Sequence, residues 1–592
     1  MRRSALLAVC ACAFTPIFTA AASGAGTPGR TSPSITPTLG TASARGTTTT
    51  ASSEAPIPVA PSNTPPAGRQ LSPDRVLAIA AALPKMRKVR AEYHGSYGGA
   101  YLKGPLRWQV SYFSKNGKKE IGQVIIDDLT GRVVEQWTGF QVAWTMARGY
   151  PGAFGRHVTS LYVWLPLCLL FVLPFVNPRR PFSLLHLDLL VLLAFSVSLA
   201  FFDHANIYAS VPLVYPPLLY LLARMLALLR RERTGRRAPG QLRLLVPAPW
   251  LAVAVVFLIG FRVALNVTDG NVIDVGYAGV IGAQRIADGR PLYGSYPSDN
   301  EHGDTYGPVN YEAYLPFQQV FGWSGTWDDL PASHAASLFF DLLAAGLMFL
   351  IGRRMRGPTL GIALAYAWVA FPFTLYALES DSNDTLVGAL VLAAVLASGY
   401  RSAAGTAARG VFSALAGLTK FAPLALAPIF ALHGLRERPA RRRPWTLALF
   451  LIAFAAAAAL ASIPALAHDS LHEIYARTIE YQANRGSPFS VWGLYGGLGG
   501  EQLAVEIGAV ALALALAVLP RRADLAGLAA ACAAVVIATQ LGIEHWFYLY
   551  IPWFFPLVMI ALLGRFSDPR LPPPDAASAP ARSSLPAVVA SS

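Results

Sequence analysis

Long apolar runs recur along the chain from residue 159 to residue 564. Most of them approach the ~20 residues that an α-helix needs to cross the hydrocarbon layer of a bilayer. The pattern therefore predicts an α-helical polytopic membrane protein with about 11–13 spans. The candidate spans are 159–177, 183–202, 207–229, 244–265, 336–352, 358–377, 385–400, 409–419, 421–434, 444–463, 502–519, 524–541 and 546–564.

Two of these runs, 409–419 and 421–434, are too short to cross a bilayer alone, and they meet at Lys420. Irregular backbone at membrane depth is tolerated where it lines a cavity inside the protein. We therefore expect a broken helical pair whose tip carries Lys420.

The chain before the first span follows other patterns. Residues 1–23 combine Arg2 and Arg3 with an apolar stretch, which is typical of a signal peptide or an uncleaved anchor. Residues 24–69 are rich in Ser, Thr, Pro, Gly and Ala, and they predict a disordered linker.

Residues 70–155 show helical and strand-like periodicity in succession. A helical segment begins at Ser72, a suitable N-cap residue. Alternating apolar and polar residues then mark the segments 106–114, 120–128 and 132–139, and Asn-Gly between the first two favours a hairpin. A small α+β domain is expected here. The later chain divides into N-terminal membrane spans (156–243), a membrane core (244–566) and a disordered tail (567–592).

Composition and charge agree with a membrane protein. Hydrophobic residues make up 54% of the chain and charged residues 14%, whereas soluble domains carry roughly 25% charged residues. No basic patch is interleaved with aromatic residues, so we expect no nucleic-acid partner. The four cysteines form no disulfide framework and no zinc motif.

The net charge of +15 arises mainly in a few loops. Lys and Arg accumulate in cytoplasmic loops of membrane proteins, and here they fall on one side if the spans alternate. The loops 266–335 and 464–500 and the 70–155 domain are then extracytoplasmic, and the C-terminus is cytoplasmic. The basic segments are 179–180, 230–237, 353–356, 436–443, 521–522 and 565–570.

The loop 266–335 is long for a connection, and loops of this length are usually functional or disordered. Asp269 and Asp274 follow the preceding span, and a short amphipathic helix begins beside Asp274. A stretch rich in Gly, Pro and Tyr comes next. We interpret this loop as an ordered extracytoplasmic site.

Four pieces of sequence stand out between residues 274 and 496: Asp274–Tyr293, TYGPVNYEAYLPF (305–317), GLTKFAPLALAP (417–428) and SPFSVWGLYG (487–496). Together they resemble the polytopic GT-C glycosyltransferases, in particular glycosyltransferase family 87, the DUF2029-type mannosyltransferases. The resemblance covers roughly residues 244–565, and its departure is TYGP where the family often has a Tyr-Pro-Pro-type sequence. The 70–155 segment in turn resembles a PepSY-like domain, which implies a packing or sensing module.

The resemblance implies an inverting transfer of a sugar, most commonly mannose, from a polyprenyl-phosphate donor to an extracytoplasmic glycan, lipid or protein acceptor. Such a reaction needs a carboxylate that takes the acceptor proton and a cation near the leaving phosphate. Asp274 is the candidate general base; its alternative role is a helix N-cap, and Asp269 is its competitor. Membrane lipid is a further expected partner.

Three cations are candidates for binding the donor phosphate: Lys420, Arg285 and Arg290. The alternative for Lys420 is a side chain that snorkels to the interface. Candidates for the acceptor or the cavity wall are Tyr306, Tyr311, Arg485 and His545, although an interfacial aromatic belt also explains the tyrosines.

No metal site is predicted, although Glu379, Asp381 and Asp384 lie close together in one short loop. Carboxylates of this kind suit a divalent cation, and a solvated loop is the favoured interpretation. Two other classes of function stay open. A transporter or flippase would be indicated by an inverted repeat, of which the sequence gives no sign, and a non-catalytic membrane sensor would make Asp274 dispensable.

Overall fold

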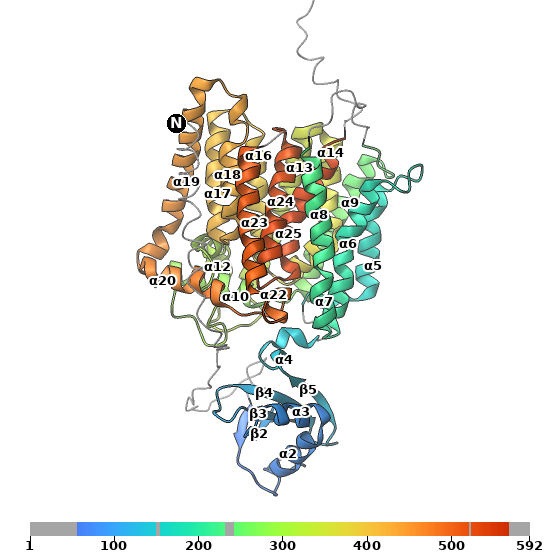
Figure 1. Cartoon of the computed structure of the whole chain (residues 1–592), viewed down its shortest axis with the longest axis vertical. Helices are drawn as coiled ribbons and strands as arrows, with labels where there is room; N and C mark the ends of the chain where they lie inside the picture. Colours follow the sequence, from blue (N-terminus) through green and yellow to red (C-terminus); the bar gives the residue numbers. More distant parts are fainter. Residues whose placement is uncertain (1–55, 150–153, 231–241, 520–521, 567–592) are drawn as a thin grey trace, which may run out of the picture.

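A computed structural model of the chain describes residues 56–149, 154–230, 242–519 and 522–566. It has two parts, a sheet domain (residues 56–138) and a large helical bundle (residues 161–566) (Figure 1). The predicted leader and the predicted tail lie outside the described residues. The expected fold class, a helical membrane protein with a small α+β domain, is confirmed.

The sheet domain is a five-stranded antiparallel meander in the order β1-β2-β3-β4-β5. Ser72 is the N-cap of the first helix, as predicted, and its Oγ accepts from Arg75 N at 3.3 Å. Pro84 divides the predicted helix because proline cannot continue the backbone hydrogen-bond ladder. The elements are β1 (Ile57–Val59), α2 (Pro73–Ala82), α3 (Pro84–Glu92), β2 (Tyr97–Lys103), β3 (Arg107–Phe113), β4 (Glu120–Asp127) and β5 (Val133–Thr138).

The sequence missed two strands and set the linker boundary too late. Ile57–Val59 pairs with Ala100–Leu102, so this end of the predicted disordered linker 24–69 belongs to the sheet. Strand β2 contains Gly98 and Gly99, which lower strand propensity. Pairing with β3 along its whole length outweighs that preference.

A buried carboxylate fastens the start of the sheet domain to its core. Asp128 is 1% exposed, and it accepts hydrogen bonds from Gln70 N, Leu71 N and Trp108 Nε1 at 3.0, 3.0 and 2.8 Å. The residue that follows β4 thus also holds the segment that leads into α2.

Seven helices of the described chain are long and apolar enough to cross a membrane, or eight if the bent pair α14 (Pro358–Ala370) and α15 (Pro372–Glu379) is one span. The protein is therefore a multi-pass membrane protein. The seven are α6 (Leu184–Asp203), α7–α8 (Ile207–Leu213 and Tyr215–Leu228), α9 (Ala248–Asp269), α13 (Pro331–Arg356), η7–α19 (Ala440–Leu466), α23 (Gly499–Val518) and α24 (Leu525–Gly542).

Long spans are fewer than the 11–13 expected because several apolar runs form short helices. Proline divides the run 358–377 into two helices bent by 55°. The short bundle helices are α5 (Leu161–Val172), α16 (Asp384–Ser398), α17 (Ala403–Thr419), α18 (Ala427–Leu432) and α25 (Ile551–Leu563).

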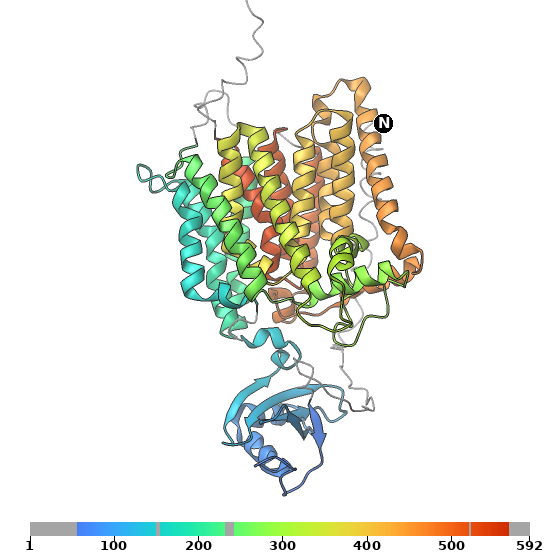
Figure 2. The ribbon, with the colours of Figure 1, turned by 180° about the vertical axis from the view of Figure 1, so that it is seen from behind.

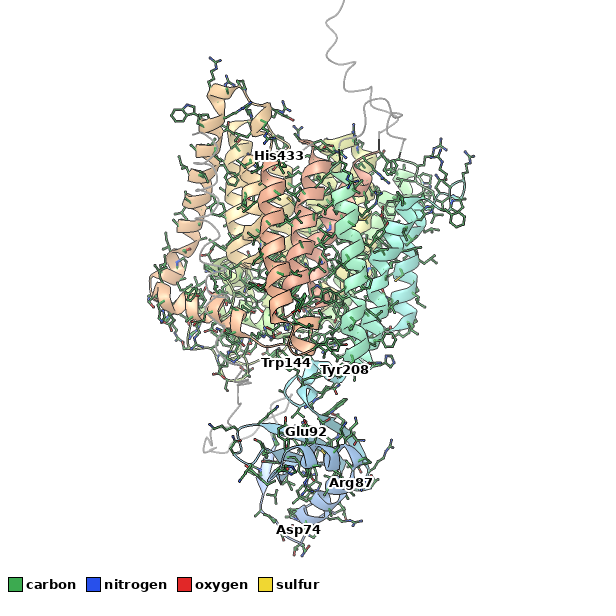
Figure 3. All side chains as sticks on the ribbon, viewed as in Figure 1. Asp74, Arg87, Glu92, Trp144, Tyr208 and His433 are labelled. Carbon is green, nitrogen blue, oxygen red and sulfur yellow. The ribbon has the colours of Figure 1, made fainter. Side chains whose placement is uncertain are left out.

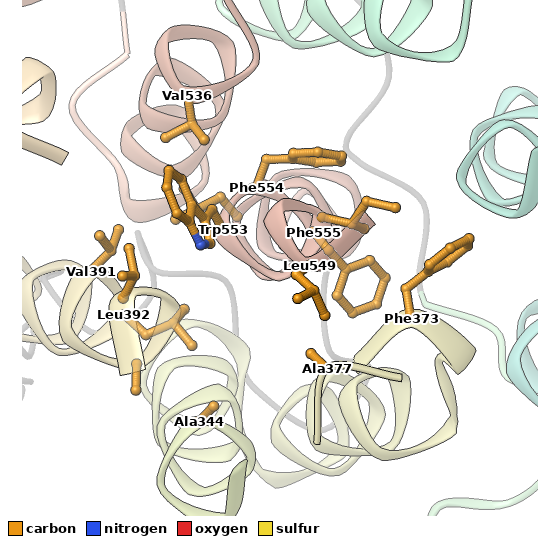
Figure 4. Packing of buried hydrophobic residues seen from close by; sticks show 14 of the residues in the cluster. Ala344, Phe373, Ala377, Val391, Leu392, Val536, Leu549, Trp553, Phe554 and Phe555 are labelled. Atoms are coloured by element: carbon orange, nitrogen blue, oxygen red, sulfur yellow. The ribbon is translucent and has the colours of Figure 1, made fainter. Parts of the chain in front are cut away.

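Helix α25 lies at the centre of the bundle, and each of its 13 residues is buried. Its aromatic side chains leave the helix in different directions, with Trp553 toward α16 and Phe555 toward Phe373 of α15 (Figure 4). The ring of Phe555 stacks on that of Phe371, with centroids 3.9 Å apart. A helix that is apolar all round can be buried on every side in this way.

Two carboxylates within the long spans are paired with arginines. Asp341 accepts from Arg262 Nε at 2.9 Å and from Trp368 Nε1 at 2.9 Å. Asp188 accepts from Arg224 Nε at 2.9 Å. Because an unpaired charge in an apolar interior is costly, these pairs explain the two carboxylates as structural groups.

The predicted break at Lys420 is present. Helix α17 ends at Thr419, and a 3₁₀ turn, η5 (Ala422–Leu426), leads into α18. The chain then returns beside the start of α17, because Arg409 Nη1 donates to His433 O at 3.1 Å.

The two ends of the bundle differ in what they carry. The sheet domain and the short helices of the loops lie at one end (Figures 1 and 2), and His433 lies at the other, far from Trp144 (Figure 3). Those short helices are α4 (Phe140–Ala143), α10 (Asp274–Ala287), α11 (Pro308–Glu312), α12 (Leu315–Phe321), α20 (Leu471–Tyr475), α21 (Tyr481–Asn484) and α22 (Val491–Leu494).

Candidate active site

Asp274 is the first residue of α10, and its side chain is open to water. The N-cap is Ile273, so the alternative interpretation of Asp274 as the N-cap is wrong. Asn300 Nδ2 donates to the backbone carbonyl of Asp274 at 2.9 Å and ties the helix start to the following loop. The carboxylate itself accepts a hydrogen bond from the backbone of Val275 in the first turn of the helix.

Protein surrounds this carboxylate although water reaches it. Partial desolvation raises the pKa of Asp274, and the positive charges of Arg485 and Lys420 oppose that rise. The negative charge of Asp384 adds to it. A raised pKa among charged neighbours is typical of a residue that exchanges protons during catalysis. We call Asp274, Arg485 and Lys420, with the side chains that contact them, the recess.

Lys420 lies in an ion pair enclosed by aromatic rings. Its Nζ donates to Asp384 Oδ1 at 2.6 Å, and the two side chains are 10% and 1% exposed. The ring centroids of Tyr306, Tyr550 and Trp553 lie 5.3, 5.4 and 5.4 Å from Nζ, close enough for cation–π attraction. This burial excludes the alternative in which Lys420 snorkels to the interface.

Asp384 connects the helices whose residues surround Lys420. It is the first residue of α16, and its Oδ1 also accepts from Trp553 Nε1 at 2.9 Å. One carboxylate thereby joins α16, the end of α17 and α25. The sequence analysis treated Asp384 as part of a solvated loop, but the structure buries it.

Tyr306 reaches Lys420 because the chain passes very close to the end of α17. Gly307 N donates to Thr419 O at 3.2 Å, and a Cβ on Gly307 would lie 1.9 Å from Leu418 O. Only glycine permits this approach. The TYGP sequence, which departs from the family pattern, is therefore the part of the loop that places Tyr306 over the lysine.

Arg485, His545 and Trp144 close the other side of the recess. The guanidinium of Arg485 lies 5.4 Å from the Trp144 ring centroid, and the imidazole of His545 lies 5.9 Å from it. Burial, reinforced by the charges of Arg485 and Lys420, lowers the pKa of His545 well below its ordinary value. His545 is therefore neutral at neutral pH, and its Nδ1 lies 2.9 Å from Ser487 Oγ.

Other predicted site residues lie elsewhere. Arg285 is eleven residues along α10 from Asp274, about 16 Å at the helical rise, and its Nη2 donates to Ser295 O at 2.6 Å. Arg290 is exposed and lies 3.6 Å from Asp288 Oδ2. The structure does not bring these two arginines to Asp274.

Tyr311 and Asp269 have structural contacts instead. Tyr311 is fully buried, and its hydroxyl donates to Gly303 O at 2.8 Å. It therefore stabilises the loop that contains Gly303 and does not line the surface. Asp269 lies at the end of α9, where its Oδ1 is 2.6 Å from His157 Nδ1. It thereby joins the bundle to the segment that follows the sheet domain.

No group of three or more His, Cys, Asp or Glu side chains is placed to hold a metal ion in the described parts of the chain. Asp381 is held by His334 at 3.0 Å and by Asn266 Nδ2 at 3.1 Å. Asp384 is occupied by Lys420. The acidic loop is therefore neither a solvated surface loop nor a ready metal site.

Three aromatic residues of the site were not predicted from the sequence. Trp553 and Tyr550 lie in an apolar run whose pattern indicates only burial, and Trp144 follows the sheet domain without a motif. A lysine in apolar surroundings needs partners such as aromatic rings. Lys420 could therefore have indicated an aromatic partner, although not that this partner is Trp553.

Comparison with known proteins bears on the same region. Residues 305–542 match the model of glycosyltransferase family 87. This confirms the resemblance predicted from sequence and the enzyme class, a glycosyltransferase, that it implies. The match contains Lys420 and Arg485 and begins after Asp274. No curated protein sequence matches the chain.

A structural similarity was also found, to the crystal structure of ArnT from Cupriavidus metallidurans bound to undecaprenyl phosphate. The TM-score is 0.36 and the sequence identity is 16%. The similarity covers 54% of this chain and 60% of that chain, so it spans about three fifths of ArnT.

The ion pair can be tested through stability. Asp384→Asn leaves Lys420 buried without a counter-charge, which should cost about 3–5 kcal/mol, measured as a large fall in apparent melting temperature in detergent. Asp384→Asn combined with Lys420→Met should recover part of the loss, and Asp288→Asn, in an exposed pair, serves as the control. Equal stability of Asp384→Asn and the control would contradict the assignment.

Proposed function

We propose that this protein is an integral-membrane glycosyltransferase of the GT-C type. It transfers a sugar, mannose by the family resemblance, from a polyprenyl-phosphate donor to a hydroxyl of an extracytoplasmic glycan, lipid or protein acceptor. One observation carries the proposal: Asp274 is open to water beside the charges of Arg485 and Lys420. The region that supplies both cations matches glycosyltransferase family 87.

The chemistry is a single displacement with inversion at the anomeric carbon. The Asp274 carboxylate takes the proton of the acceptor hydroxyl as its oxygen forms the new glycosidic bond. The bond between the anomeric carbon and the phosphate oxygen breaks, and the electron pair leaves on the phosphate. The products are the glycosylated acceptor and the polyprenyl-phosphate anion.

Arg485 is the stronger candidate to stabilise that leaving phosphate. No ion pair to a carboxylate involves Arg485 among the described residues. Lys420, by contrast, is already paired with Asp384. An arginine without a counter-charge can bind two phosphate oxygens at once, and Lys420 then adds positive potential behind it.

A small apolar slot, with a volume of about 20 Å³, is a proposed contact surface for part of the prenyl chain. It runs between α16, η5, α24 and α25 and ends at Trp553, the residue whose indole binds Asp384. A lipid tail in the slot would have its phosphate directed toward the enclosed lysine. Its apolar walls include Val387, Val391, Ala422, Pro423, Leu426, Val535 and Val536.

The proposed orientation places the recess and the sheet domain outside the cytoplasm. Arg354, Arg401 and Arg438 line a pocket at the His433 end of the bundle, and basic residues accumulate on the cytoplasmic side. The PepSY-like domain then lies over the acceptor side, where Trp144 connects it to the recess.

The general base is tested by Asp274→Asn. This change removes the proton acceptor but keeps the side-chain volume, so transfer should fall about 100-fold or more. The assay is transfer from radiolabelled polyprenyl-phosphate mannose in membranes. Asp288→Asn, at the other end of α10, should retain activity, and near-normal activity of Asp274→Asn would refute the proposal.

The pH dependence tests the pairing of Arg485 with the base. Asp274 must be deprotonated to act, so activity rises as the pH rises through its pKa. The charge of Arg485 lowers that pKa; hence Arg485→Gln should move the acidic limb of the rate profile to higher pH. Arg290→Gln removes a distant charge and should leave the limb in place. An unmoved limb in Arg485→Gln would contradict the pairing.

A further inference from the structure

A second charged cavity lies at the end of the bundle that carries His433, opposite the sheet domain (Figure 3). Its volume is about 280 Å³, enough for a phosphate group with its water. Four arginines from different segments line it: Arg354, Arg401, Arg409 and Arg438. We call it the arginine pocket, and nothing in the proposed transfer reaction uses it.

The carboxylates of the arginine pocket neutralise only part of this charge. Glu437 forms an ion pair with Arg401. Asp524 is held by Arg522 and also accepts from Gly527 N at the start of α24. Both acidic side chains that line the pocket are therefore occupied.

The three other arginines contact neutral groups. Arg354 Nη2 donates to Gly399 O at 2.8 Å, and Arg438 Nη2 donates to Arg401 O at 2.5 Å. Arg409 Nη1 donates to His433 O at 3.1 Å. None of the three forms an ion pair with a carboxylate in the part of the chain that the structure describes, so three positive charges converge without compensation.

Arg409 is the unusual member because it is 5% exposed and its buried Nε has no hydrogen-bond partner. A buried guanidinium nitrogen without a partner is costly. An anion in the pocket would supply the counter-charge that this guanidinium lacks. Phosphate groups match the planar donor fork of arginine particularly well.

A mostly apolar pocket, whose lining also includes Arg230 and Arg522, adjoins this one and shares His433 and Gly434 with it. The combination of a cationic cavity and an apolar one suits a molecule with a phosphate head and a hydrocarbon tail. The apolar lining includes Leu226, Leu229, Ile429, Leu516, Leu519 and Leu528.

We propose that the arginine pocket is a binding site for a phosphate-bearing ligand, with the phosphate held by Arg409, Arg354 and Arg438. The adjoining apolar pocket favours an anionic phospholipid over free phosphate as the source of that group. The site is separate from the Asp274 recess and does not depend on the proposed transfer reaction.

The test uses the full-length protein, purified and delipidated in detergent. Native mass spectrometry measures binding of phosphatidylglycerol against phosphatidylcholine, and calorimetry measures binding of inorganic phosphate. Arg409→Gln should weaken binding about tenfold or more, because it removes a charge-assisted contact. Arg353→Gln, on the same end of α13 but outside the pocket lining, is the matched control and should bind as the unmodified protein does.

The outcomes separate the two sources. Phosphatidylglycerol binding that Arg409→Gln reduces and Arg353→Gln preserves supports a lipid headgroup, and the same pattern with inorganic phosphate alone supports a free phosphate. If Arg409→Gln does not fold, Arg438→Gln at the half-buried rim replaces it. Equal binding by pocket and control variants, or no preference for anionic ligands, would overturn the proposal.

Discussion

A lysine enclosed in an apolar helical bundle needs a counter-charge, and the structure of this site follows from how Lys420 obtains one. Asp384 supplies the charge and also accepts from Trp553. This arrangement fixes the end of α17 against the start of α16 and against α25. Removing one partner of a buried ion pair destabilises a protein far more than breaking a surface pair does. The pair of Asp384 and Lys420 therefore holds the three helices in one register. The side chains around Asp274 are positioned relative to this ion pair.

Segments far apart in sequence complete the recess. The TYGP turn brings Tyr306 over Lys420, and the segment after the sheet domain brings Trp144 onto Arg485. A positively charged guanidinium is thereby held near a carboxylate without pairing to it in a direct salt bridge. That separation leaves both groups able to act on a third molecule, which is what a transfer of a sugar from a phosphate requires.

Local patterns predicted much of this structure. The membrane-spanning helical bundle, the Ser72 cap and three of the five strands follow from hydrophobic periodicity and turn chemistry, whereas the number of long spans does not. The break at Lys420 follows from two short apolar runs. The partners of Lys420 do not, because an aspartate and a tryptophan more than thirty residues away carry no local sign of their pairing. Arg285 and Arg290 show the opposite case. They lie close to Asp274 in the sequence, but the structure does not bring them close to it in space.

The most direct test is the dissociation constant of undecaprenyl phosphate for the purified protein and its variants in detergent. We expect the lipid phosphate to bind and Arg485→Gln to weaken binding about tenfold or more, since a charge-assisted contact is lost. Arg290→Gln should leave the constant unchanged. Equal affinity of the unmodified protein and Arg485→Gln would contradict the assignment of this recess as the site of a lipid-linked donor.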